Sequence, residues 1–161
     1  MKILVSGFRG DTNSAKLVLD RIESKYSLEK LYLENSFNIS KNQLESRLKN
    51  QSYDLIIAFG QKPNTKSIYL EQKACFNKNE FANDYDYGNL KKLLNSNGFT
   101  VKISNNAGNY LCNHIFYTGL QIIDKSKLNT KMMFIHIPSI KNISNIDYLS
   151  KVFSLYIDKF Y

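Results

Sequence analysis

The apolar stretch at residues 55–59 restricts the possible folds of this chain more than any other feature. It belongs to a predicted strand over residues 53–59, and its run of Leu, Ile, Ile, Ala and Phe contains no polar residue. A strand of this kind is buried on both faces, as in the middle of a parallel sheet that helices cover on both sides. The run at residues 132–138, which ends in a proline, predicts a second buried strand.

Shorter strands and helices alternate along the rest of the chain. Apolar patterning predicts further strands at residues 2–8, 28–33, 67–76 and 99–103. Helices are predicted to begin near Asn13, to follow an N-cap at Ser40, and to cover residues 90–97, 115–123 and 146–156. The polar residues 77–89 are expected to form a loop. This alternation predicts a three-layer α/β/α sandwich with a mixed, largely parallel central sheet, built as a single domain over residues 1–161.

Composition excludes several classes of protein. The 161 residues are enough for a sizeable core, and no apolar run approaches the ~20 residues of a membrane helix. The apolar run after Lys2 is too short for a signal peptide, so a cytoplasmic protein is expected. The only cysteines, Cys75 and Cys112, are expected to be free thiols. No metal site is expected, because Cys112-x-His114 is not a zinc spacing and no C-x-x-C pair occurs.

The net charge of +8 raises the question of nucleic-acid binding. The lysines are scattered along the chain, however, and no basic run of five residues occurs. Arginine is scarce and is found only at Arg9, Arg21 and Arg47. We therefore interpret the positive charge as solvated lysine-bearing faces, and nucleic acid is not an expected partner.

Cys112 stands where a predicted strand passes into a predicted helix. The polar loop before it, residues 104–110, contains small residues and a glycine, and Cys112 falls near the first turn of the helix. Backbone N–H groups are unpaired there and the helix dipole is positive, which favours a thiolate. A thiolate at this place is a candidate nucleophile. The alternative is a small apolar side chain at the start of a packed helix.

A cysteine nucleophile needs a base, and the chain has two histidines. His114 lies about 200° around the same helix from Cys112 and is expected to point away from it. His136 lies in the buried strand at residues 132–138. It would lie beside Cys112 if that strand neighboured the strand that ends at Ile103. The alternative for His136 is a core histidine that is hydrogen-bonded to a carbonyl group.

Glu71 is the best candidate for the acid that orients the imidazole. It lies on the extended segment that follows the turn at residues 60–64. An ionised carboxylate there would hold the imidazole and stabilise its charged form. The alternative is an exposed edge residue that faces Lys73. Together with the cysteine and the histidine, Glu71 gives a possible Cys/His/Glu set at one edge of the sheet.

Several motifs resemble those of the pyroglutamyl peptidase I family. SNNAGNYLCNH at residues 104–114 resembles its nucleophile motif, in which S-N-x-A-G-x-Y-x-C-N precedes an apolar helix. FIHIP at residues 134–138 is similar to its histidine motif, and AFGQ at residues 58–61 to a strand that ends in G-Q. SIYLEQKA at residues 67–74 is similar to the segment that supplies its acid. The motifs occur in the family's order over most of the chain.

The resemblance implies a cysteine peptidase that removes an N-terminal pyroglutamyl residue from peptides. It implies Cys112 as the nucleophile, with its N–H group in the oxyanion site, His136 as base and acid, and Glu71 as the residue that orients His136. The substrate pocket would then be floored by Phe8, Gln61 and Leu111. No metal or organic cofactor is implied, and family members often form dimers or tetramers.

The chain departs from the family pattern in two loops. Residues 7–13 lack the second aromatic residue and the paired glycines, and Arg9 takes up part of this loop. The segment after Glu71 is short and lacks the arginine of the family pattern. Lys78 is the candidate for a partial replacement of that arginine. These departures leave two alternatives open. The scaffold acts on another short N-acyl amide, or the chain is a non-catalytic domain whose basic surface binds an acidic partner or nucleic acid.

Overall fold

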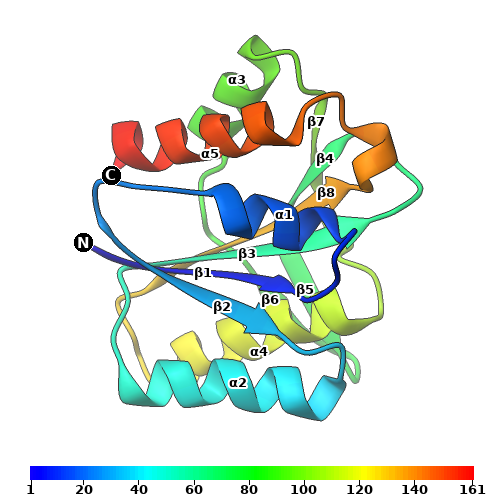
Figure 1. Ribbon diagram of the computed structural model, residues 1–161. Helices are drawn as coiled ribbons and strands as arrows, with labels where there is room; N and C mark the ends of the chain where they lie inside the picture. The colour runs from blue at the N-terminus through cyan, green and yellow to red at the C-terminus, as the bar shows by residue number, and fades with distance from the viewer.

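A six-stranded sheet forms the middle of the molecule. The computed structural model describes residues 1–161, and the strands follow the order β2-β1-β3-β8-β4-β7 (Figure 1). The first four run parallel to one another, β4 runs antiparallel to β8, and β7 runs parallel to β4. The strand bounds are β1 Lys2–Phe8, β2 Ser27–Leu33, β3 Leu55–Lys62, β4 Ile68–Glu71, β7 Val101–Ser104 and β8 Lys131–Pro138.

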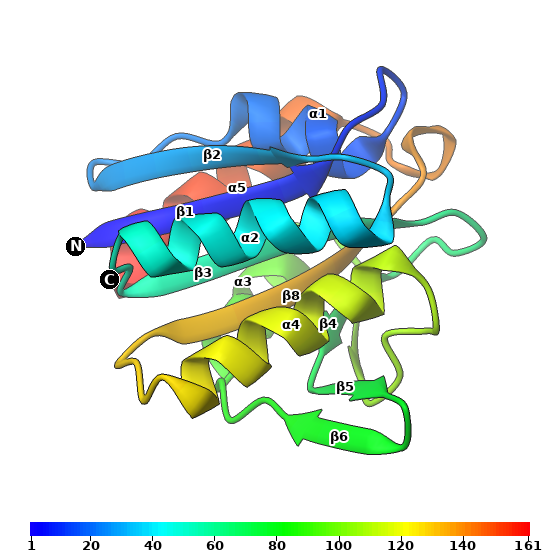
Figure 2. The same cartoon turned by 90° about the horizontal axis from the view of Figure 1, so that it is seen from below.

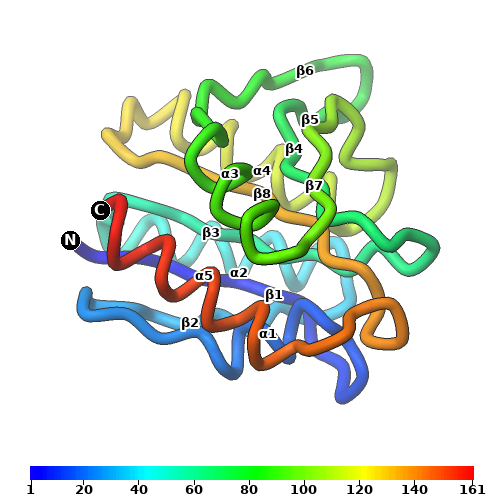
Figure 3. The backbone as a smooth tube through the Cα atoms, turned by 90° about the horizontal axis from the view of Figure 1, so that it is seen from above, coloured from blue at the N-terminus to red at the C-terminus, as the bar shows by residue number.

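Helices cover both faces of this sheet, so the predicted three-layer α/β/α architecture is confirmed. One face packs against α1 (Ser14–Arg21), α3 (Gly88–Ser96) and α5 (Ile146–Phe160), which lie toward the viewer in Figure 3. The other face packs against α2 (Phe37–Asn50) and α4 (Leu111–Lys125), with a small hairpin of β5 (Lys73–Phe76) and β6 (Asn79–Ala82) beside α4 (Figure 2). A 3-10 turn, Ile140–Asn142, links β8 to α5.

Alternation along the central strands decides which face each side chain meets. On β3, Ile57 and Phe59 join the core under α1 and α5, whereas Ile56 and Ala58 join the core under α2 and α4. On β8, Ile135 belongs to the first of these cores and Phe134 to the second. By the same alternation, Gly60 on β3 and His136 on β8 also face α4. Glu71 on β4 is the register partner of Phe134 and faces the same side. The start of α4 covers this part of the sheet.

The predicted N-cap at Ser40 is wrong. Ser36 caps α2 instead, because its extended backbone lets its side chain accept a hydrogen bond from Ile39 N. Ser40 is buried one turn later, where its hydroxyl donates to Ser36 O at 2.6 Å. Two serines four residues apart carry the same sequence signal, and only the backbone conformation separates them.

The expectations for residues 67–89 also need correction. Residues 67–76 do not form one extended segment, because the chain leaves the central sheet after Glu71 and begins the separate β5–β6 hairpin. Residues 77–89 are not all loop, since they contain β6 and the start of α3. Asn77 and Lys78, with φ of 48° and 65°, form the left-handed two-residue turn that a hairpin requires. None of the helices combines the length and the apolar character needed to span a bilayer.

Candidate active site

The carboxyl ends of β3 and β8 place Gly60 and His136 next to each other. The two residues are register partners in the parallel pair, so they lie at the same level of the sheet. Glu71 reaches the same place from the antiparallel strand β4. It is opposite Phe134, two residues from His136 and on the same face, which is a diagonal position that a long side chain can bridge.

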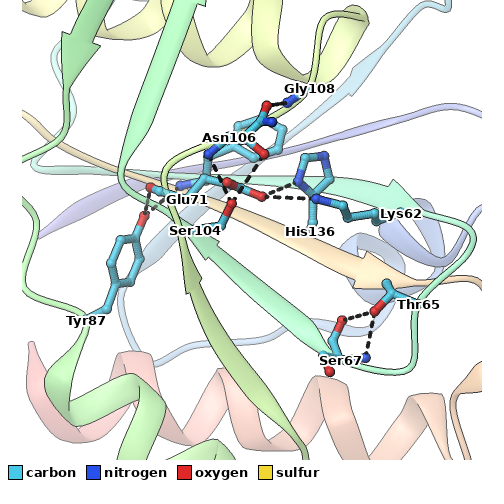
Figure 4. A network of polar contacts seen from close by, with 10 residues as sticks. Lys62, Thr65, Ser67, Glu71, Tyr87, Ser104, Asn106, Gly108 and His136 are labelled. Atoms are coloured by element: carbon cyan, nitrogen blue, oxygen red, sulfur yellow. Dashed lines mark hydrogen bonds and ion pairs between the residues drawn. The ribbon is translucent and has the colours of Figure 1, made fainter.

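The imidazole of His136 and the carboxylate of Glu71 form a buried pair. His136 Nδ1 lies 2.7 Å from Glu71 Oε1, and the two side chains are 5% and 0% exposed (Figure 4). Because a carboxylate only accepts hydrogen bonds, this contact assigns the proton to Nδ1 and leaves the lone pair of Nε2 free. The pair can therefore present an oriented base.

Cys112 meets this base across Gly60. A carbon atom in the side-chain position of Gly60 would stand 2.7 Å from Cys112 Sγ and 3.0 Å from His136 Cδ2. Both atoms are thus close to one point, and Cδ2 is the ring carbon bonded to Nε2. The thiol and the basic edge of the imidazole are neighbours only because residue 60 has no side chain.

The loop before Cys112 is held by its own polar side chains. Ser104 Oγ accepts a hydrogen bond from Asn106 N, and Asn106 Oδ1 accepts one from Gly108 N, at 3.1 and 2.9 Å (Figure 4). Gly108 has a φ of 85°, a left-handed conformation that favours glycine. The chain then enters α4, in which Cys112 is the second residue. The sequence prediction that Cys112 lies in the first turn of a helix is confirmed.

Burial controls the ionisation of Cys112. It raises the pKa of the thiol from its ordinary 9.0 to about 12, and the negative charge of Glu71 adds to the increase. The backbone N–H of Cys112 and the ammonium of Lys62 act in the opposite direction. The expectation that the helix start favours a thiolate in the resting protein is therefore wrong. The helix terminus does lower the pKa, but desolvation has the larger effect.

Glu71 has two further neighbours, Lys62 and Tyr87. Lys62 Nζ lies 3.9 Å from Glu71 Oε1 (Figure 4). The buried hydroxyl of Tyr87 donates to Glu71 O at 3.0 Å and accepts from Phe134 N at 3.1 Å. A phenol thus joins β4 to β8 at the level of the carboxylate and fixes the backbone that carries Glu71.

The sequence predicts that His136 lies beside Cys112 if the strand of His136 neighbours the strand that ends at Ile103. The structure has a different strand order. β8 does not neighbour β7, because β4 lies between them and both β4 and β7 run antiparallel to β8. The loop after β7 and the start of α4 bring Cys112 across the sheet face instead. His114 lies between the rings of Phe37 and Phe76, with centroids 5.3 and 5.2 Å away, as its place on the helix predicts.

Similarity to known proteins covers nearly the whole chain. The model of the pyroglutamyl peptidase family matches residues 87–160. A pyrrolidone-carboxylate peptidase of Thermosipho melanesiensis is 30% identical over an alignment 168 residues long. The alignment covers 86% of this chain and 83% of that protein. The chain belongs to the pyroglutamyl peptidase family. It is therefore a cysteine peptidase.

Other relatives agree with this assignment. A pyrrolidone-carboxylate peptidase of Brachyspira hyodysenteriae is 29% identical over 169 residues, covering 87% of this chain and 84% of that protein. The crystal structure of a pyrrolidone carboxyl peptidase from Fervidobacterium islandicum has a TM-score of 0.85 at 18% identity, covering 99% of this chain and 98% of the other. That likeness shows that the two proteins share a fold.

Two of the three residues proposed as the pocket of this pyroglutamyl peptidase family member, Phe8 and Leu111, lie on the α4 side of the sheet, whereas the side chain of Gln61 lies on the α1 side. Phe8 and Leu111 are buried in the core cluster against which Cys112 packs. The side chain of Gln61 is already engaged, because its Oε1 accepts hydrogen bonds from Ser14 N and Ser14 Oγ at 2.8 and 3.2 Å. Gln61 thus holds the start of α1.

Sequence reasoning missed several residues that shape the site of this family member. Gly60 belongs to the AFGQ motif. Only the structure shows that residue 60 must lack a side chain, because Cys112 packs against it. The side chain of Asn113 is hydrogen-bonded to the backbone of β5. It accepts a hydrogen bond from Cys75 N at 2.9 Å and donates one to Cys75 O at 2.5 Å. Lys62, and not Lys78 in the hairpin turn, approaches Glu71. The only signal for Lys62 was its position just after the G-Q motif.

Proposed function

We propose that this protein removes N-terminal pyroglutamyl groups from peptides, with Cys112 as the nucleophile, His136 as base and acid, and Glu71 as the residue that orients His136. One observation carries the proposal. A buried imidazole–carboxylate pair, 2.7 Å apart, and the sulfur of a cysteine in the first turn of a helix both border the side-chain position that Gly60 leaves empty. The names of the relatives, pyrrolidone-carboxylate peptidases, supply the substrate class.

The first half of the proposed reaction acylates the enzyme. His136 Nε2 takes the thiol proton of Cys112 as sulfur attacks the carbonyl carbon that joins the pyroglutamyl residue to the next residue. The C–S bond forms and the carbonyl electron pair moves to oxygen, where the N–H of Cys112 can donate to the oxyanion. The C–N bond then breaks, and His136 returns the proton to the leaving amine. A thioester on Cys112 remains.

The second half hydrolyses the thioester. His136 takes a proton from water, whose oxygen attacks the acyl carbon, and the C–S bond breaks to release pyroglutamate. The sulfur recovers a proton from His136. Glu71 stabilises the imidazolium in both halves through its contact with Nδ1. The raised pKa of Cys112 suits this scheme, since the proton then leaves sulfur only when His136 receives it as the C–S bond forms.

The lactam ring is proposed to lie against Phe8 and Leu111, with the backbone of Gln61 facing the polar edge of the ring. Both apolar side chains belong to the core cluster against which Cys112 packs. We further propose that the protein works in the cytoplasm, where a reducing environment keeps its two free thiols reduced. A homodimer or homotetramer is proposed from the family resemblance, and light scattering tests it.

The direct test is release of a fluorescent amine from a pyroglutamyl-amide substrate. The wild type should cleave it, and Cys112→Ala should reduce turnover to background. Cys75→Ala is the matched control, because it removes the other free thiol, which hydrogen-bonds to Glu80 rather than to the site. Cleavage by Cys112→Ala at the wild-type rate would contradict the proposal. Inertness of the folded wild type toward every amide tested would favour a non-catalytic binding domain.

A second candidate is the same chemistry on another short N-acyl amide. The loop at residues 7–13 favours it, because Arg9 stands where the resemblance leads one to expect an apolar wall. Its guanidinium pairs with Glu34 at 2.8 Å. A panel of N-acyl amides with one common leaving group separates the two candidates. A clear preference for the pyroglutamyl amide would exclude the second.

A further inference from the structure

Glu71 presents an unbalanced charge in the interior. Its side chain is fully buried, Oε1 contacts His136, and Oε2 has no hydrogen-bond partner. Removing an ionised carboxylate from water is costly unless another charge compensates it. In its proposed role as the base, the imidazole of His136 is neutral, so it supplies one hydrogen bond but no positive charge. The resting site therefore needs a cation close to Glu71.

Lys62 is placed to be that cation. It is the last residue of β3, two positions after Gly60, and its ammonium lies 3.9 Å from Glu71 Oε1. The ring of Tyr69, the register partner of His136, lies beneath the ammonium, with Nζ 4.2 Å from its centroid. The Lys62 side chain is 36% exposed. An aromatic face thus holds a partly desolvated ammonium beside the buried carboxylate. Figure 4 shows the contacts that the Glu71 carboxylate makes with His136 and with Lys62.

We propose that Lys62 is a positioning residue of the active site, whose ammonium compensates the buried charge of Glu71 and stabilises negative charge on the sulfur of Cys112. The proposal rests on the proposed function for its catalytic meaning, but its effect on the thiol does not require a substrate. Nothing in the family motifs that the sequence contains assigns a role to this lysine.

The charges around the thiol agree with this role. Glu71 on β4 raises the pKa of Cys112, and Lys62 on β3 lowers it, so the two side chains act against each other. His136 on β8 borders the same Gly60 position as the thiol, and Tyr69 on β4 is the register partner of His136. On α4 itself, His114 packs between aromatic rings on another side. Without Lys62, Glu71 would oppose formation of the thiolate with only the helix start acting against it.

The chain offers a matched control for this lysine. Lys102, on β7, also lies over the ring of Tyr69, with Nζ 5.8 Å from its centroid, but it makes no ion pair with Glu71. Lys102→Met therefore removes the same charge from the same aromatic ring without touching the carboxylate. Lys62→Met removes the proposed cation, and Lys62→Arg keeps the positive charge.

The test measures alkylation of Cys112 by iodoacetamide, in a Cys75→Ala background, between pH 7 and about 10. Below the pKa, the rate rises tenfold per pH unit, so a displaced pKa appears as a constant fold-change. Lys62→Met should slow alkylation about threefold to tenfold at each pH. Lys62→Arg should restore most of the rate, and Lys102→Met should match the wild type. Circular dichroism checks that each variant is folded.

Turnover of the pyroglutamyl amide gives a second readout. Lys62→Met should lower kcat with little change in KM, because the lysine is proposed to act on the thiol rather than on the substrate. Equal alkylation rates for Lys62→Met and wild type, or equal slowing by Lys102→Met, would overturn the proposal. If the wild type cleaves no amide but alkylation slows only in Lys62→Met, the inference about Lys62 stands and the proposed function fails.

Discussion

Gly60→Ala is the substitution whose effect follows most directly from the structure. The added carbon would stand 2.7 Å from Cys112 Sγ, 3.0 Å from His136 Cδ2 and 3.1 Å from Phe134 Cε1, whereas ordinary contacts begin at 3.4 Å. The sulfur and the imidazole must therefore separate. A misplacement of about 1 Å can cost ~10²-fold in rate, so we expect kcat for the pyroglutamyl amide to fall by about that factor. Overpacking should also lower the free energy of unfolding by about 1–3 kcal/mol.

The assay compares Gly60→Ala with Gly119→Ala. At Gly119 the added carbon would meet Met132 Sδ at 2.5 Å, in the α4 core and away from the thiol, and the flexible thioether can move. Both variants add one methyl group to a packed place, but only the first adds it between sulfur and imidazole. Urea unfolding measures the stability of each variant, and steady-state kinetics measures kcat. Wild-type kcat in a folded Gly60→Ala protein would refute the geometry proposed for catalysis.

Further predictions concern the groups around this place. Glu71→Gln should lower kcat at least about 10²-fold, yet speed alkylation of Cys112 at fixed pH, because the carboxylate raises the pKa of the thiol. Tyr87→Phe loses hydrogen bonds to Glu71 O and Phe134 N, and should lower the urea unfolding free energy by about 1–3 kcal/mol. The raised pKa of Cys112 favours the folded form only while the thiol is protonated. Urea unfolding should therefore show the stability of the wild type falling relative to Cys112→Ala as pH rises from 9.0 to about 12.

Much of the architecture could be predicted because its signals are local. The buried runs of β3 and β8 and the spacing of α4 and α5 each appear within a single stretch of sequence. Period-two alternation alone puts His136 on the same sheet face as Phe134 and hence under α4. Glu71 is predicted mainly from the family motif, because no local pattern distinguishes it from other acidic residues.

The rest depends on distant parts of the chain. No local pattern shows that the four residues of β4 insert between β8 and β7 and run antiparallel to β8. The pKa of Cys112 depends on how deeply the thiol is buried, and the helix terminus predicts only the smaller, opposite effect. The importance of Gly60 is a steric fact about α4 lying over β3. The proposed role of Lys62 depends on its contact with Glu71, which lies on another strand, so no local pattern predicts it.

Detection of the acyl-enzyme tests the central claim most directly. The protein is mixed with a pyroglutamyl-amide substrate, quenched in acid within one turnover, digested, and analysed by mass spectrometry. The mechanism predicts a pyroglutamyl thioester on the peptide that contains Cys112, and none on the peptide that contains Cys75. Full turnover with Cys112 unmodified at every quench time, or with the acyl group on another residue, would contradict the account.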